Sequence, residues 1–191
     1  MTNLSDFSDD ELDQILDAPG AVLKGATLAD GQPGAIQFFK EMASGAKVFR
    51  EAQEHENDFV REVAVAMRAR LGEQNAAEAE AARNPASQVG VASAAAATDR
   101  AATDRAATEG ARPDPEGETA RAVELTAASV KVLRERADAA DVEAYADWIL
   151  RIAEEVAEAA GTKEGGFFSK RVMVSTGERD FIDRLTAAVG R

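Results

Sequence analysis

Acidic side chains gather at the predicted starts of two helices, and carboxylates are the groups in this chain best suited to chemistry. The first group is Asp9, Asp10 and Asp13, and the second is Asp138 and Asp141. Carboxylate oxygens bind hard divalent cations such as calcium and magnesium. They also stabilise the first turn of a helix, where the helix dipole favours negative charge. We expect the helix-start role, predict no metal ligand, and keep divalent-cation binding as the alternative.

The chain contains one histidine, His55, and no cysteine. A zinc site needs several nitrogen or sulfur ligands, and a single histidine without a second one at helical spacing does not supply them. Without cysteine there is no thiolate nucleophile, disulfide or iron–sulfur cluster. We therefore expect His55 to be an exposed residue between two helices, and we expect no catalytic residue and no enzyme activity.

A glycine-rich segment near the carboxyl-terminal end has the spacing of a phosphate-binding loop, with Gly161 followed by Gly166. In such a loop, a lysine and a hydroxyl residue come next and reach the phosphates and magnesium. Here those two positions hold Phe167 and Phe168, and the preceding element is a predicted helix rather than a strand. The sequence therefore excludes nucleotide binding at this loop, and we expect no cofactor.

An apolar segment that also carries two cations follows the glycines. Its members are Phe167, Phe168, Lys170, Arg171, Val172 and Met173. Apolar side chains grouped in one segment either close the end of a helix bundle or form a contact surface for another protein. We predict a partner-binding surface at residues 167–174, with the bundle plug as the alternative.

Apolar residues recur at helical spacing through most of the chain. The predicted helices span about 8–17, 21–29, 35–52, 57–72, 118–136, 138–160 and 175–190. The clearest stripe places Tyr145, Trp148 and Ile152 on one face, where we expect them to be core residues. Pro19 and Gly20 are expected to end the first helix and begin the second. The predicted fold is all-α, a helical bundle of about six or seven helices.

Composition changes at residues 73–117, which are rich in alanine, threonine, aspartate and arginine. The pattern Ala-Ala-Thr-Asp-Arg repeats with a period of five, which fits no helical repeat. We predict a disordered, low-complexity linker between an N-terminal helical group at 1–72 and a C-terminal group at 118–191. We expect the two groups to pack as one domain. Alternatively, residues 73–83 prolong the preceding helix, because glutamate and alanine are strong helix formers.

The chain has 35 acidic and 22 basic residues and a net charge of −13. A field of this sign repels the phosphates of nucleic acids, and the longest basic cluster is only Lys170 with Arg171. No apolar run is long enough to span a bilayer, and the first residues do not form a signal-peptide pattern. We predict a cytoplasmic protein with no nucleic-acid partner and no membrane span.

The carboxyl-terminal residues resemble a known family. A Val-Ser-x-x-Glu pattern that begins at Val174 precedes a stripe of Phe181, Ile182 and Leu185, and a glycine ends the stripe. This arrangement resembles the ending of TerB-like proteins of the tellurite-resistance group, and also the tails of small uncharacterised bacterial helical proteins. The resemblance implies a bacterial, helical stress-response protein associated with divalent metal ions.

Two functions are therefore predicted. The first is a non-enzymatic, cytoplasmic interaction or accessory protein that binds a protein partner or a second copy of itself through the apolar segment. The alternative is a TerB-like stress-response protein that binds a divalent cation through its clustered carboxylates.

Overall fold

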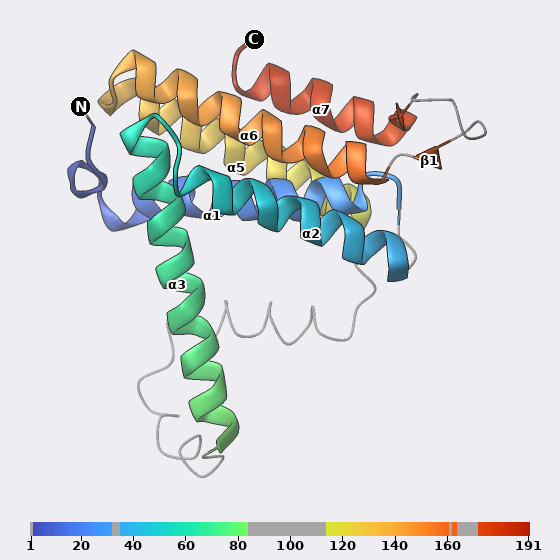
Figure 1. Cartoon of the computed structure of the whole chain (residues 1–191). Helices are drawn as coiled ribbons and strands as arrows, with labels where there is room; N and C mark the ends of the chain where they lie inside the picture. Colours follow the sequence, from blue (N-terminus) through green and yellow to red (C-terminus); the bar gives the residue numbers. More distant parts are fainter. Residues whose placement is uncertain (1, 32–34, 84–113, 161, 164–171) are drawn as a thin grey trace. The chain divides into compact units, whose positions relative to one another are not determined.

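The computed structural model describes all residues except 1, 32–34, 84–113, 161 and 164–171 (Figure 1). The described residues form six α-helices, and the predicted all-α bundle is confirmed. The elements in chain order are the 3-10 turn η1 (Leu4–Asp6), α1 (Asp9–Leu28), α2 (Ala35–Ala52), α3 (Asp58–Arg83), α5 (Pro115–Arg136), α6 (Ala139–Ala160), β1 (Thr162–Lys163), β2 (Val172–Met173) and α7 (Thr176–Ala188). The two strands form a short antiparallel ladder in which Thr162 pairs with Met173 and Lys163 with Val172.

The chain divides into two compact units. The first consists of Met1–Ala66 together with Asp114–Arg191, and the second is Met67–Pro113. In the first unit, α1 packs mainly against α5 and also against α6, α2 packs against α6, and α7 packs against both α5 and α6. Figure 1 shows α1, α2, α5 and α6 running side by side. In the second unit the described residues belong to α3, and residues 84–113 of the predicted linker lie outside the described part of the chain.

Helix α1 continues through Pro19, so the predicted break at this residue is wrong. Proline lacks a backbone N–H and therefore removes one hydrogen bond from a helix interior. The carbonyl that loses this donor belongs to Ile15, and it receives a hydrogen bond from Tyr145 on α6 instead. Because the carbonyl is satisfied from another helix, α1 does not have to end there.

Two other helix boundaries differ from the expected ones. Helix α3 runs to Arg83, which is the alternative in which residues 73–83 prolong the helix. Helix α5 begins at Pro115, before the expected start at residue 118. Proline suits the first helical position, since its missing N–H has no partner within the helix there. Residues 73–83 and 115–117 of the predicted linker are therefore helical.

A row of aromatic side chains forms the centre of the first unit. Phe7 lies 6.0 Å from Phe59, and Phe59 lies 6.4 Å from Tyr145, between ring centroids. Tyr145 in turn lies 6.1 Å from Trp148, which meets Phe49 edge-on at 5.7 Å. Edge-on and tilted pairs at these spacings are favourable beyond simple burial. The predicted core role of Trp148 is confirmed, since it is only 3% exposed.

Candidate functional site

The segment predicted to bind a partner lies largely outside the described residues. Phe167, Phe168, Lys170 and Arg171 are not among them, whereas the backbones of Val172 and Met173 form β2. Their pairing with β1 joins the chain on both sides of residues 164–171. Two members of the segment therefore belong to a strand that pairs with the residues following α6, a relationship that the sequence alone does not reveal.

The carboxylate of Asp141 is buried at the start of α6, with 8% of the residue exposed. The Nδ2 of Asn57 donates to its Oδ1 at 2.8 Å, and the backbone N–H of Thr2 donates to its Oδ2 at 3.1 Å. Burial by itself raises the pKa of Asp141. The hydrogen bonds from Asn57 and Thr2 outweigh that effect, so the pKa lies below its usual value. Both carboxylate oxygens thus serve as internal acceptors.

The residues around Asp141 connect three distant parts of the chain. The side-chain Oδ1 of Asn57 accepts from the backbone N–H of Val60 at 3.0 Å, which caps the start of α3. The backbone N–H of Asp138 donates to the hydroxyl of Thr2 at 2.9 Å. Asp141 therefore fixes the amino-terminal segment and the start of α3 to α6. This cluster was not predicted, because its members lie far apart in the sequence.

The acidic residues at the start of α1 have the helix-start role that their positions predicted. Asp9 and Asp10 are exposed in the first turn. The backbone N–H and the hydroxyl of Ser8 both donate to Oε2 of Glu11, at 2.9 and 2.8 Å. These two bonds, together with the charge of Arg136, hold the pKa of Glu11 below its usual value. Among the described residues, no three His, Asp or Glu side chains are grouped to hold a metal ion.

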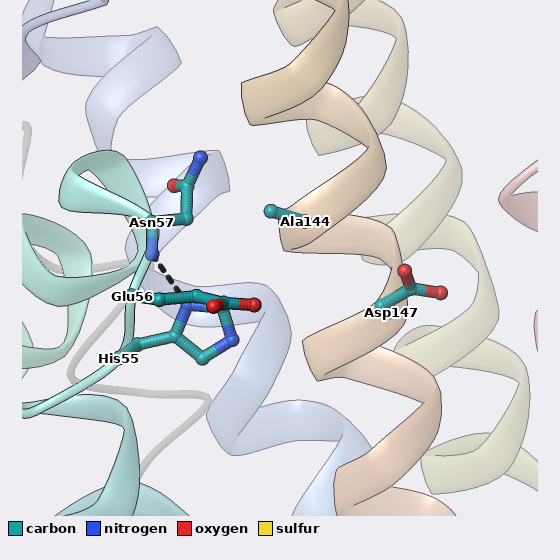
Figure 2. Close-up of a pocket in the computed structure, with 5 residues that line it drawn as sticks. All are labelled: His55, Glu56, Asn57, Ala144 and Asp147. Carbon is teal, nitrogen blue, oxygen red and sulfur yellow. Dashed lines mark hydrogen bonds between the residues drawn. The ribbon is translucent and has the colours of Figure 1, made fainter.

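A surface pocket of about 450 Å³ lies between the α2–α3 connection and α6 (Figure 2). His55, Glu56 and Asn57 line one side of it, and Ala144 and Asp147 line the other. The predicted position of His55 between two helices is confirmed, although the residue is half-buried rather than exposed. Its Nδ1 accepts from the backbone N–H of Asn57 at 3.1 Å, so the ring is held in place.

The chemistry of this pocket is limited by how its side chains point. Figure 2 shows Glu56 extending beside the His55 ring, while the carboxylate of Asp147 points away from both. Asp147 forms an ion pair with Arg191 instead. No hydroxyl nucleophile lines the pocket, and the side chain of Asn57 is already bonded to Asp141 and Val60. The pocket therefore offers neither a nucleophile with its base nor two converging carboxylates.

A second pocket, of about 330 Å³, lies where the end of α5 meets the end of α7. Its two cations are Arg134 and Arg191, beside the apolar Val142 and Val189. The guanidinium of Arg134 donates to the carbonyl of Val189 at 2.7 Å, a favourable position for a cation at the end of a helix. Since Arg191 is paired with Asp147, both cations already have protein partners.

Tyr145 is a core residue, as predicted, but the sequence pattern gave no indication of the hydrogen bond that its hydroxyl makes. Its hydroxyl donates to the carbonyl of Ile15 at 2.8 Å, and the residue is fully buried. Burial raises the pKa of the phenol, and the nearby hydroxyl of Ser129 opposes this only in part. The phenol therefore acts as a neutral hydrogen-bond donor. Pro19 is the signal that could have indicated it, since a proline within a helix leaves a carbonyl that needs a donor.

Comparison with known proteins identifies no similar protein. No family model, no curated protein and no solved structure matches the chain. The resemblance to TerB-like proteins stays a prediction from the sequence. Among the described residues, no helix has the length and apolar content required to cross a membrane.

Proposed function

We propose that this chain is a non-enzymatic interaction protein whose contact surface is the apolar segment at residues 167–174. The observation that carries the proposal is the β1–β2 ladder, which pairs Lys163 of β1 with Val172, a member of this segment. A ladder of this kind limits the separation of the two ends of the connection. It ties Val172 and Met173 to the two residues that form β1 after α6.

The helices that precede and follow the segment, α6 and α7, are both firmly anchored. Helix α6 places Ile149, Ile152 and Val156 in the core, each at 0% exposure. Helix α7 begins with a capping box in which the backbone N–H of Ser175 donates to Glu178 at 2.7 Å and the N–H of Glu178 donates to the hydroxyl of Ser175 at 3.1 Å. A segment between two well-anchored helix ends loses less conformational freedom when it binds a partner.

The composition of the segment suggests the chemistry of the partner. Phe167 and Phe168 supply aromatic surface, which is enriched at the centres of protein interfaces. Lys170 and Arg171 are two cations within a chain of net charge −13. We infer a partner surface that combines an apolar depression with acidic residues at its rim.

The polar groups of the core support a role without catalysis. The hydroxyl of Thr126 donates to the carbonyl of Ala122 at 2.8 Å, and that of Ser129 donates to the carbonyl of Thr126 at 2.9 Å. Those two bonds lie within α5, whereas the bonds of Tyr145 and Asp141 join different parts of the chain. Each of these polar groups therefore already has a partner within the protein.

The test replaces both Phe167 and Phe168 by serine and compares the partners captured from native cells by cross-linking and mass spectrometry. We expect the double variant to lose a specific partner while its helical circular dichroism is unchanged. The matched control is Val65→Ser on α3, which removes an apolar side chain that is 51% exposed. This control should keep the partner. A partner set that the double variant leaves intact would refute the proposed surface.

The second arm of the test concerns charge. Reversing Lys170 and Arg171 to glutamate should weaken capture of the same partner and remove most of its dependence on salt, because rim charges act mainly on the rate of association. Reversing the exposed Arg184 on α7 serves as the control. Equal effects of the two changes would show that overall charge governs binding.

A further inference from the structure

The pocket between the α2–α3 connection and α6 contains two polar groups without a partner among the described residues (Figure 2). One is the carboxylate of Glu56. The other is Nε2 of His55, on the ring beside which Glu56 extends. Since Nδ1 of this ring accepts the backbone N–H of Asn57, the hydrogen of the neutral imidazole is on Nε2. The pocket therefore offers one negatively charged acceptor and one N–H donor.

His55 is held in position on both its ring and its backbone. Besides the bond at Nδ1, its carbonyl accepts from the guanidinium of Arg61 at 2.6 Å, and its backbone N–H donates to the carbonyl of Ala52 at 3.2 Å. A group that is already fixed loses little conformational freedom when a ligand binds. The N–H donor of the pocket is therefore in place before any ligand arrives.

Negative charge prevails around the pocket. The lining residue Asn57 donates through Nδ2 to the buried carboxylate of Asp141 at 2.8 Å, so this carboxylate lies directly behind the pocket wall. Its hydrogen bonds come from the neutral amide groups of Asn57 and Thr2, which leave its charge in place. The charge of Asp147, in contrast, is balanced by Arg191. Glu56 and Asp141 together favour a cation in the pocket, and the net charge of −13 attracts it over a longer range.

We propose that this pocket binds an α-ammonium group together with the carbonyl oxygen next to it, the arrangement found in amino acids and at the amino termini of peptides. The ammonium group pairs with the carboxylate of Glu56, and the oxygen accepts the N–H at Nε2 of His55. Hydrogen bonds between charged groups are about twice as strong as neutral ones, so the ammonium group supplies most of the affinity. The volume of about 450 Å³ lies within the range of small-molecule sites.

Two other cations fit the pocket less well. A metal ion needs a lone pair from the imidazole, whereas Nε2 presents a hydrogen, and the described residues contain no group of three His, Asp or Glu side chains for a metal. A guanidinium group has five donors and no acceptor, so it leaves the N–H of His55 without a partner. The α-ammonium with its carbonyl uses both polar groups.

The test is calorimetric titration of the full chain with three small probes. Alaninamide carries both the ammonium group and the carbonyl, and we expect it to bind. N-acetyl-alaninamide lacks the charge and should give no binding heat. Propylamine lacks the carbonyl and should bind about two- to tenfold more weakly than alaninamide, the usual value of one hydrogen bond. No heat with alaninamide, or equal affinity for the acetylated probe, would overturn the proposal.

Two further probes distinguish the sources of this chemistry. Tighter binding of trialaninamide than of alanine assigns the site to peptide amino termini, and the reverse order assigns it to free amino acids. We expect the peptide to bind more tightly, because the carboxylate of free alanine brings a second negative charge towards Glu56 and Asp141.

Variants assign the binding to the two polar groups. Glu56→Gln should lower the affinity for alaninamide at least about tenfold. Glu54→Gln removes the same charge from an exposed residue outside the pocket lining and should leave the affinity unchanged. Equal losses in the two variants would show that overall charge governs binding and would contradict the role of Glu56.

His55→Phe keeps a ring but removes its N–H. It should lower the affinity for alaninamide and leave the affinity for propylamine unchanged, whereas a purely structural role of His55 predicts that both fall. Circular dichroism checks that each variant keeps its helices. The residues tested lie outside the segment 167–174, so a negative result here leaves the proposed partner surface intact.

Discussion

The hydroxyl of Tyr145 donates a 2.8 Å hydrogen bond to the carbonyl of Ile15, the residue four positions before Pro19 in α1. In an α-helix this carbonyl would receive the N–H of residue 19, and proline has none. Ile15 is completely buried, so water cannot replace the missing donor. One side chain of α6 thus repairs the hydrogen-bond ladder of α1 and fixes the two helices to each other.

Replacing Tyr145 by phenylalanine should destabilise the protein by about 1 to 3 kcal/mol, the usual cost of leaving a buried polar group without a partner. The ring and its packing against Phe59 and Trp148 are retained, so the change isolates the hydrogen bond. Urea unfolding followed by circular dichroism gives the free energy. An unchanged midpoint would mean that Ile15 finds another donor.

The control for this prediction is Pro19→Ala, which restores an N–H at residue 19. In that background the carbonyl of Ile15 has a donor in its own helix, so Tyr145→Phe should cost clearly less. Double-mutant cycles of this kind measure the coupling of two neighbouring sites. Equal costs with proline and with alanine would show that the carbonyl is not what Tyr145 stabilises.

This contact explains why the helices could be predicted from the sequence while the break in α1 could not. Apolar stripes such as Tyr145, Trp148 and Ile152 report which face of a helix is buried, and that information is local. Whether Pro19 ends a helix depends on what satisfies the carbonyl of Ile15. The donor is 130 residues away in the chain. A proline rule that considers only neighbouring residues therefore predicted a break.

The candidate sites also show that local contacts can be predicted from the sequence and that long-range contacts cannot. The helix-start role of Asp9 and Asp10 was predicted correctly, because capping depends on residues within one turn. The cluster at Asp141 was missed, since it brings together Asn57 and Thr2, which are 84 and 139 residues away. Only the folded structure brings these two residues beside Asp141.

Replacing Asp141 by asparagine should destabilise the protein at pH 7, and the loss should shrink as the pH falls below about 4. The pKa of Asp141 is lowered in the folded protein, chiefly because its hydrogen bonds to Asn57 and Thr2 outweigh burial. A group with a lowered folded pKa contributes stability above its unfolded pKa of about 3.9 and loses it as the pH falls through the folded value. Urea midpoints at pH 7 and pH 3 measure the difference.

The control for this pH dependence is Asp180→Asn on α7, a side chain 71% exposed and 3.8 Å from Arg184. Exposed substitutions of this kind change stability by no more than about 0.5 kcal/mol. If Asp141→Asn cost the same at both pH values, the pKa of the Asp141 carboxylate would not be lowered by folding.

Replacing Ser175 by alanine should destabilise α7 by about 1 kcal/mol, because the hydroxyl of Ser175 accepts the N–H of Glu178. The neighbouring Thr176 is exposed in the first turn, and Thr176→Ala is the matched control with little expected loss. Thermal unfolding of the two variants provides the comparison. Equal Tm values would argue against a capping role for Ser175.

Replacing each of two glycines of α1 by alanine should change the stability of the protein in opposite directions. A Cβ at Gly25 would lie 2.9 Å from the ring of Phe181 and 3.1 Å from Cβ of Ala122, whereas a Cβ at Gly20 would meet nothing within 4 Å. Gly25→Ala should cost about 1 to 3 kcal/mol through overpacking. Gly20→Ala should stabilise by up to about 1 kcal/mol, since alanine favours the helix.

Chemical denaturation of both variants shows whether each substitution raises or lowers the free energy of unfolding. A second substitution, at Phe181, tests whether the loss at Gly25 comes from contact with that ring. Phe181 is 1% exposed, and its ring would lie 2.9 Å from a Cβ at Gly25. Phe181→Leu shortens that side chain, so it should cost less in the Gly25→Ala background than in the natural chain. If Gly25→Ala stabilised the protein as much as Gly20→Ala, α7 would not be packed against α1 at this position.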